Sequence, residues 1–142
     1  MRDDLRPSET VTPRWDVLVV DDEAVVRNGV SKILEAEGLR VAAAEDAASA
    51  LGHPALAGCR LVLCDLVLPD TSGIELITLL RHRRPGLPVV LITGYATGEQ
   101  EALARSAGAA AFLAKPFDEG ELLATVRAAL ETSKKAPEEK RP

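Results

Sequence analysis

Residues 61–70, "LVLCDLVLPD", have the apolar composition of a buried strand but contain an acid, Asp65, in the middle. Seven of these ten residues are apolar, and Asp65 stands among them with no basic neighbour. Burying an unpaired carboxylate is costly, so such groups are normally paired, metal-bound or protonated. The rest of the chain must therefore supply a partner for Asp65.

Apolar runs alternate with amphipathic segments on both sides of this stretch. Runs that are apolar at every residue are typical of strands covered on both faces. Five such strands alternating with five helices predict an α/β fold with a parallel sheet. We expect strands at residues 16–20, 40–46, 60–66, 88–93 and 110–114, and helices at 23–38, 47–57 (interrupted by Pro54), 72–86, 98–109 and 118–131.

The 142 residues are enough for one domain, which we place at residues 15–131. Residues 1–14 and 132–142 are rich in Pro, Ser, Thr and charge, and we expect them to be disordered tails. The start of the chain has no signal-peptide pattern, and no apolar run approaches the ~20 residues that span a bilayer. We expect a soluble, cytoplasmic protein. The net charge of −5 argues against binding to nucleic acid or to an anionic membrane.

Polar residues follow four of the five predicted strands. Asp21 and Asp22 follow "VLVV", Asp65 follows "LVLC", Thr93 follows "VVLI" and Lys115 follows "AFLA". The carboxyl ends of parallel strands share one edge, where open α/β sheets bind their ligands. Three carboxylates, one hydroxyl and one ammonium are therefore expected to converge there.

This combination predicts metal-assisted chemistry on phosphorus. Three carboxylates repel one another unless a hard cation such as Mg²⁺ joins them. A carboxylate beside such a metal can act as a nucleophile, and Lys115 and Thr93 can bind the oxygens of a transferring phosphoryl group. Each residue alone could be a helix cap or a turn former. Their joint occurrence favours Asp65 as a phosphate acceptor.

Four blocks of the sequence, "LVVDDE", "LVLCDLVLPDTSG", "LITGYA" and "FLAKPFD", resemble the signature blocks of receiver domains of two-component response regulators. The resemblance covers about residues 15–131. It implies a flavodoxin-like, doubly wound (βα)5 fold with strand order 2-1-3-4-5. It also implies that Asp65 accepts a phosphoryl group from a sensor histidine kinase or a histidine phosphotransfer protein.

The same resemblance implies a role for each residue of the site. Asp22 would bind Mg²⁺ directly and Asp21 chiefly through water. Asp65 itself and the backbone carbonyl of Val67 would complete the protein ligands. The phosphoryl oxygens would be bound by Thr93 and Lys115.

The resemblance also implies features that concern the switch and the lifetime of the phosphorylated form. The peptide between Lys115 and Pro116 would be cis, and Phe112 matches the aromatic residue whose rotamer couples to Thr93. The side chains of Val67 and Tyr95 would flank the approach of the hydrolytic water. A protein target would be contacted through about residues 99–131, and a homodimer could form on phosphorylation.

Two other functions fit the sequence less well. A phosphatase of the haloacid-dehalogenase type needs a second aspartate two residues after its nucleophile, and that position is Val67. A degenerate receiver that only binds partners does not need the complete set of five polar residues. The sequence names neither the kinase nor the output partner, and it leaves open whether the domain stands alone.

Overall fold

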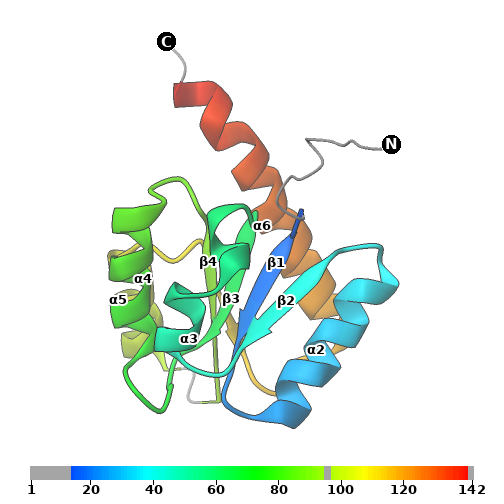
Figure 1. Cartoon of the computed structure of the whole chain (residues 1–142). Helices are drawn as coiled ribbons and strands as arrows, with labels where there is room; N and C mark the ends of the chain where they lie inside the picture. Colours follow the sequence, from blue (N-terminus) through cyan, green and yellow to red (C-terminus); the bar gives the residue numbers. More distant parts are fainter. Residues whose placement is uncertain (1–13, 95–96, 141–142) are drawn as a thin grey trace.

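The computed structural model describes residues 14–94 and 97–140, and its centre is a parallel sheet (Figure 1). The strands occur in the order β2-β1-β3-β4-β5, and every pair of neighbours is parallel. This confirms the α/β class and the predicted strand order. Their bounds are β1 Val17–Val20, β2 Val41–Ala44, β3 Leu61–Asp65, β4 Val89–Thr93 and β5 Ala111–Ala114.

Four α-helices in the described part of the chain begin after a residue whose side chain caps them. Asp46, Ser72, Thr97 and Asp118 each accept a hydrogen bond from a backbone N–H of the first turn of their helix. Pro54 starts a separate 3-10 turn, η1 (Pro54–Ala57), which agrees with the interruption that we predicted in the helix at 47–57. The helices are α2 Ala24–Ala36, α3 Ala47–Leu51, α4 Gly73–Arg83, α5 Gly98–Ala107 and α6 Glu119–Lys140.

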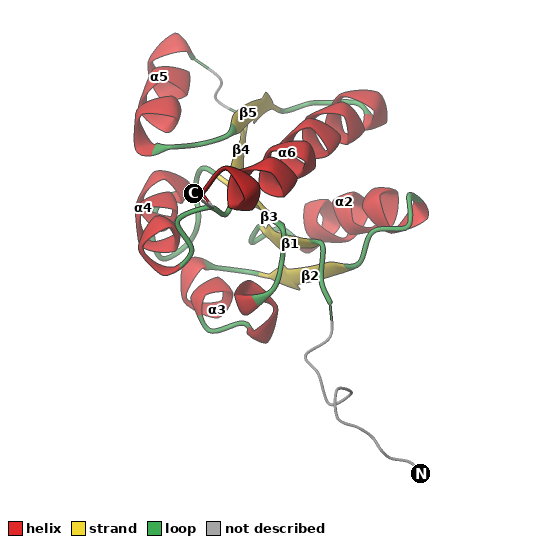
Figure 2. Cartoon of the chain, turned by 90° about the horizontal axis from the view of Figure 1, so that it is seen from above, coloured by secondary structure: helices red, strands yellow, loops and turns green. Residues whose placement is uncertain are grey.

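Two apolar layers sandwich the sheet. Helices α2 and α6 cover one face, and α3, α4 and α5 cover the other (Figure 2). Side chains alternate between the faces, so Val17 and Val19 pack towards α2 and α6 whereas Leu18 and Val20 pack towards α3–α5. Both faces are buried, which explains why these strands are apolar at every residue.

The last helix is longer than predicted. We expected it to end at residue 131 and the rest to be a tail, but α6 continues to Lys140. The prediction gave weight to the charge and the prolines of this segment. Its Lys, Ala and Glu residues, however, have a low intrinsic cost in a helix. Figure 1 shows the final turns of α6 extending beyond the sheet. The predicted tail at residues 1–14 lies almost wholly outside the described residues.

None of the helices in the described part of the chain combines the length and the apolar character needed to cross a bilayer.

Candidate functional site

Sheet register brings the predicted carboxyl groups together. Val20 pairs with Cys64, so Asp21 and Asp65 occupy equivalent positions at the ends of β1 and β3. Asp22 follows in the turn before α2. Carboxylate oxygens of these three residues all lie within 4.8 Å of one another. Asp21 is 2% exposed and Asp65 is 9% exposed, whereas Asp22 is open to solvent.

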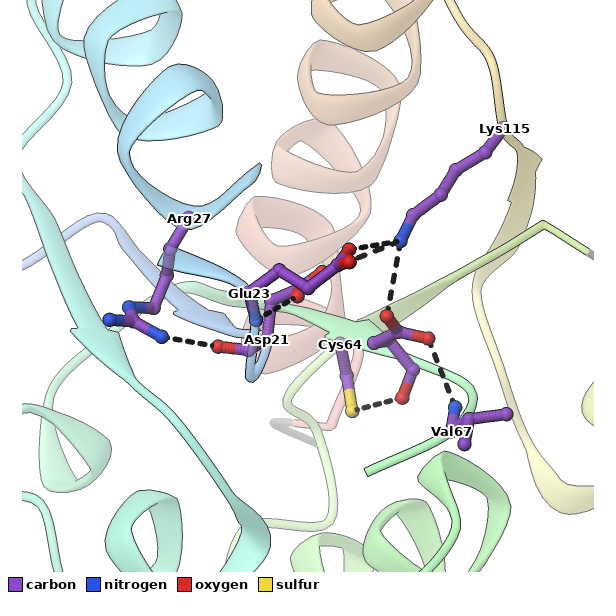
Figure 3. A network of polar contacts seen from close by, with 7 residues as sticks. Asp21, Glu23, Arg27, Cys64, Val67 and Lys115 are labelled. Carbon is purple, nitrogen blue, oxygen red and sulfur yellow. Dashed lines mark hydrogen bonds and ion pairs between the residues drawn. The ribbon is translucent and has the colours of Figure 1, made fainter. Parts of the chain in front are cut away.

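The same register brings Lys115 to this edge. Thr93 pairs with Ala114, so Lys115 follows at the end of β5, and its N–H donates to the carbonyl of Thr93. The Lys115 ammonium lies 3.1 Å from Oδ2 of Asp65 and 3.6 Å from Oδ2 of Asp21 (Figure 3). The peptide between Lys115 and Pro116 is cis, as predicted.

Asp65 is held at both carboxylate oxygens. Oδ1 accepts a hydrogen bond of 3.0 Å from the backbone N–H of Val67, and Oδ2 accepts one from Lys115. Its backbone carbonyl accepts a bond from the Cys64 thiol at 3.2 Å. Lys115 is the cationic partner that the stretch 61–70 lacks, and with the N–H of Val67 it fixes the direction in which the carboxylate points.

Burial and neighbouring charges raise the pKa values of both Asp21 and Lys115, for different reasons. Burial raises the pKa of Asp21, the negative charge of Asp65 adds to the rise, and the backbone N–H of Glu23 and the Lys115 ammonium oppose it. Burial tends to lower the pKa of Lys115. The hydrogen bond to Asp65 and the charges of the carboxylates outweigh burial, so the pKa of Lys115 is raised. Lys115 therefore stays protonated at neutral pH, and one ammonium faces several acids.

The carboxylates open into a shallow cavity of about 320 Å³. Asp65 and Lys115 lie on its wall with the buried Thr93, and Val67 lies at its mouth with 61% of its surface exposed. The remaining lining residues are Asp22, Glu23, Leu68, Pro69 and Gly94. The structure therefore brings the predicted carboxylate, hydroxyl and ammonium groups to one place.

Two further predicted residues lie elsewhere. Phe112 is half-buried on β5 and packs against the core on the α3–α5 side of the sheet. It does not line the cavity. Tyr95 lies outside the described residues.

The donor set suits a hard divalent cation. Asp21, Asp22 and Asp65 each offer a carboxylate oxygen within bridging distance of one metal ion. Oxygen ligands of this kind are those that Mg²⁺ prefers, and Mg²⁺ commonly keeps several waters. The open cavity leaves room for those waters. The residues present therefore fit such an ion.

Sequence reasoning missed two contributors. Glu23 lines the cavity, and its carboxylate lies 4.0 Å from the Lys115 ammonium. Its position directly after Asp22 could have suggested this. Arg27 donates to the backbone carbonyl of Asp21 at 2.7 Å. A side chain that reaches back to a carbonyl leaves no pattern in the sequence.

The fold and the site together define the class. The chain is a flavodoxin-like α/β protein with an acidic cluster and a lysine at the carboxyl edge of its sheet. The family model of the response regulator receiver domain matches residues 17–127, and the chain belongs to this family. It is a receiver domain of the two-component type.

Individual relatives agree with this assignment. The probable transcriptional regulatory protein TcrX of Mycobacterium tuberculosis is 38% identical over 114 residues, which are 80% of this chain and 49% of TcrX. A CheY-like receiver domain protein from Methanospirillum hungatei JF-1 has a TM-score of 0.79 and 32% identity, with 87% of this chain and 98% of that chain covered. The receiver domain of NtrX from Brucella abortus has a TM-score of 0.77 and 39% identity, with 82% of this chain and 99% of that chain covered.

The chain spans about half, or less, of the length of the curated regulators that it matches. The comparison therefore concerns the receiver part of those proteins.

Proposed function

We propose that Asp65 accepts a phosphoryl group from the phosphohistidine of a sensor histidine kinase or a histidine phosphotransfer protein. The observation that carries this proposal is the contact of 3.1 Å between the Lys115 ammonium and Oδ2 of Asp65, beside two further carboxylates and an open cavity. An aspartate held in this way is directed at solvent from a mostly buried position. The phosphoryl group then controls a protein–protein interaction surface.

The transfer exchanges one bond to phosphorus for another. A carboxylate oxygen of Asp65 forms the new P–O bond while the P–N bond to the donor imidazole breaks, and the nitrogen leaves with the electron pair. Thr93 and Lys115 bind phosphoryl oxygens, and their fixed positions stabilise charge that develops during transfer. Water later hydrolyses the acyl phosphate. In this proposal the protein catalyses its own phosphorylation and dephosphorylation, and apart from small phosphodonors it does not act on a free metabolite.

Magnesium is the cofactor that we propose for this site. Asp21, Asp22, Asp65 and the backbone carbonyl of Val67 would hold it. When bound, Mg²⁺ neutralises the charge that phosphoryl and carboxylate oxygens bring together. The carboxyl groups of the protein would hold the ion, while the Lys115 ammonium contacts Oδ2 of Asp65.

The arrangement of two strands supports the switch that we propose. Leu91 pairs with Phe112 and Thr93 pairs with Ala114, so Thr93 and Phe112 point to the same face of the sheet on neighbouring strands. We expect a phosphoryl group that draws Thr93 inward to change the space next to Phe112 and to move the loop 94–98, of which residues 95 and 96 lie outside the described residues. The proposed readout surface is formed by about residues 99–131, and a homodimer that depends on phosphorylation would use the same region.

The proposed partners are a phosphohistidine donor and a downstream protein, with no direct contact to nucleic acid or membrane. Transfer from such a kinase or phosphotransfer protein fits a cytoplasmic location. We assign residues 15–131 to the receiver unit. The matched regulators are longer, so the output of a whole protein is a separate question from the chemistry of this domain.

The test is labelling with acetyl phosphate and Mg²⁺, followed by intact mass measurement. We expect one phosphoryl group per chain on the wild type and none on Asp65→Asn or in excess EDTA. Asp118→Asn is a matched control, because Asp118 caps α6 away from the acidic cluster and asparagine preserves the cap. A phosphatase would instead turn over many equivalents, and a degenerate receiver would not be labelled. Undiminished labelling of Asp65→Asn would show that Asp65 is not the phosphoryl acceptor.

The switch has its own experiment. Beryllofluoride with Mg²⁺ should change amide chemical shifts within residues 93–117 of the wild type and leave those of Asp65→Asn unchanged. Identical spectra of the wild type with and without beryllofluoride would contradict the proposed coupling of Thr93 to Phe112.

A further inference from the structure

We infer that Arg27 is a positioning residue for the metal site: it fixes the peptide between Asp21 and Asp22 and so places the Asp22 carboxylate. This inference rests on the proposed function, because it assumes that these acids hold a divalent cation. Arg27 does not touch the ion or the phosphoryl group in this account. It acts through the backbone of the turn between β1 and α2.

The contacts of Arg27 tie the start of α2 to the end of β1. Its Nη1 donates to the backbone carbonyl of Asp21 at 2.7 Å, and its backbone N–H donates to the carbonyl of Glu23 at 2.9 Å. Figure 3 shows the guanidinium reaching back to Asp21 on the side away from Lys115. The half-buried Arg27 side chain therefore spans the whole turn that carries the acids.

Asp21 and Asp22 differ in how they are held. The Asp21 N–H donates to the carbonyl of Ala44 at 3.1 Å, and the Asp21 carboxylate accepts the N–H of Glu23 at 2.9 Å. Asp22 is exposed, and its carboxylate makes no hydrogen bond or ion pair with the residues that the structure describes. No side-chain contact in the described part of the chain holds the Asp22 carboxylate, so the backbone at Asp22 is what limits where it can lie.

Arg27 controls that backbone. The carbonyl of Asp21 and the N–H of Asp22 belong to one planar peptide unit. A hydrogen bond that fixes the carbonyl also fixes the plane, and with it the direction in which the chain enters Asp22. Groups that orient metal ligands from outside commonly contribute ten- to a hundredfold to metal affinity.

The charge of Arg27 has the opposite effect on metal binding. A positive charge near three carboxylates repels an incoming cation, so its removal alone strengthens Mg²⁺ binding. Positioning by Arg27 predicts that its removal weakens Mg²⁺ binding. The sign of the change therefore separates the two roles.

The experiment measures Mg²⁺ binding by calorimetric titration of the phosphate-free protein and its variants. Arg27→Met removes both the donor and the charge, and we expect its Kd to rise about tenfold, at the lower end of the range for outer partners. Arg27→Lys retains a donor and the charge, and Arg27→Gln retains a shorter neutral donor. We expect both to lie between wild type and Arg27→Met. Arg127→Met is the matched control, because Arg127 lies on α6 and pairs with Glu37 at the end of α2, so its loss should leave the Kd unchanged.

A second measurement reports on position without metal. The Glu23 N–H donates to the Asp21 carboxylate, and its hydrogen exchange should become faster in Arg27→Met than in the wild type and in Arg127→Met, while core amides of β3 and β4 stay protected. Should Arg27→Met fail to fold, Arg27→Gln provides the same comparison.

The outcomes distinguish this inference from the proposed function. If wild type binds Mg²⁺ and Arg27→Met binds it as tightly or more tightly, the positioning role is wrong and the metal site stands. If wild type does not bind Mg²⁺, the metal site itself is wrong and the role of Arg27 falls with it. Weaker binding by Arg27→Met together with faster exchange at Glu23 supports the inference.

Discussion

The ammonium of Lys115 lies 3.1 Å from Oδ2 of Asp65, although a whole strand separates the two residues in the sheet. Lys115 follows β5 and Asp65 ends β3, so the lysine side chain spans the end of β4. The same ammonium lies 3.6 Å from Asp21. A positive charge at this position would attract a phosphoryl group on Asp65 and repel a metal ion held by the same carboxylates.

Replacing Lys115 by methionine should separate these two effects. Loss of the ammonium removes a repulsion worth about 1 kcal/mol or more at such distances, so Mg²⁺ should bind roughly fivefold more tightly. Labelling by acetyl phosphate should nevertheless slow, because a group that stabilises the transferring phosphoryl is lost. Calorimetric titration and labelling rates measure the two effects. Lys32→Met, an exposed lysine on α2, is the control, and weaker Mg²⁺ binding by Lys115→Met would contradict this account.

Gly73 sets how closely α4 approaches the strand that carries Asp65. A Cβ atom at Gly73 would lie 2.6 Å from the carbonyl oxygen of Asp65 and 2.9 Å from Cδ2 of Leu91. Gly73→Ala should therefore lower the free energy of unfolding by about 1–3 kcal/mol, as overpacking does, and should displace Asp65. Urea denaturation and the labelling rate measure both effects.

Gly29→Ala is the matched control for that prediction. Gly29 lies within α2, and nothing is within 4 Å of a Cβ atom there. Alanine should stabilise this helix by about 0.5–1 kcal/mol relative to glycine. Equal stability of Gly73→Ala and wild type would show that the backbone at Asp65 yields without cost.

The sequence predicts the sheet well because both of its faces are buried. The strands Leu61–Asp65 and Val89–Thr93 are apolar up to their last residue, and the acid or hydroxyl at that position marks the edge that carries the candidate site. Composition was a poorer guide to the end of α6, where helix formers outweigh a disorder-like content of charge and proline. Contacts from side chain to backbone, such as Arg27 to Asp21, depend on how a turn folds and leave no periodic signal.

Asp70 gives a pH-dependent contribution to stability. Its two carboxylate oxygens accept the N–H groups of Ala47 and Ala48, each at 3.0 Å, and these bonds lower the pKa of Asp70. A lowered pKa in the folded state means that the stabilisation is fully present above the ordinary value of 3.8 and is lost as pH falls through the folded pKa. The loop that follows Asp65 is thereby joined to α3.

The test compares wild type with Asp70→Ala by urea denaturation from about pH 7 to pH 3. Wild type should be the more stable protein above about pH 5, and the difference should shrink as the pH drops below 3.8. Asp70→Asn keeps one acceptor oxygen, and its stability should lie between the two without this dependence on pH. A difference between wild type and Asp70→Ala that stays constant down to pH 3 would show that the charge of Asp70 does not strengthen these bonds.

The lifetime of the phosphorylated form should depend on Val67. Hydrolysis needs a water in line with the P–O bond, and Val67, 61% exposed at the mouth of the cavity, offers no hydrogen bond to orient it. Tyr95, which lies outside the described residues, is the second position predicted to flank that approach. We expect phosphate to be lost slowly, over many minutes or longer.

In the double variant Val67→Asn with Tyr95→Glu, polar side chains can hold the hydrolytic water, and each ~1.4 kcal/mol gained in orientation speeds decay tenfold. Decay is followed by intact mass after removal of acetyl phosphate. Val25→Asn, at an exposed valine on α2 away from the cavity lining, should decay like wild type. A double variant that decays no faster than Val25→Asn would show that these two side chains do not set the lifetime.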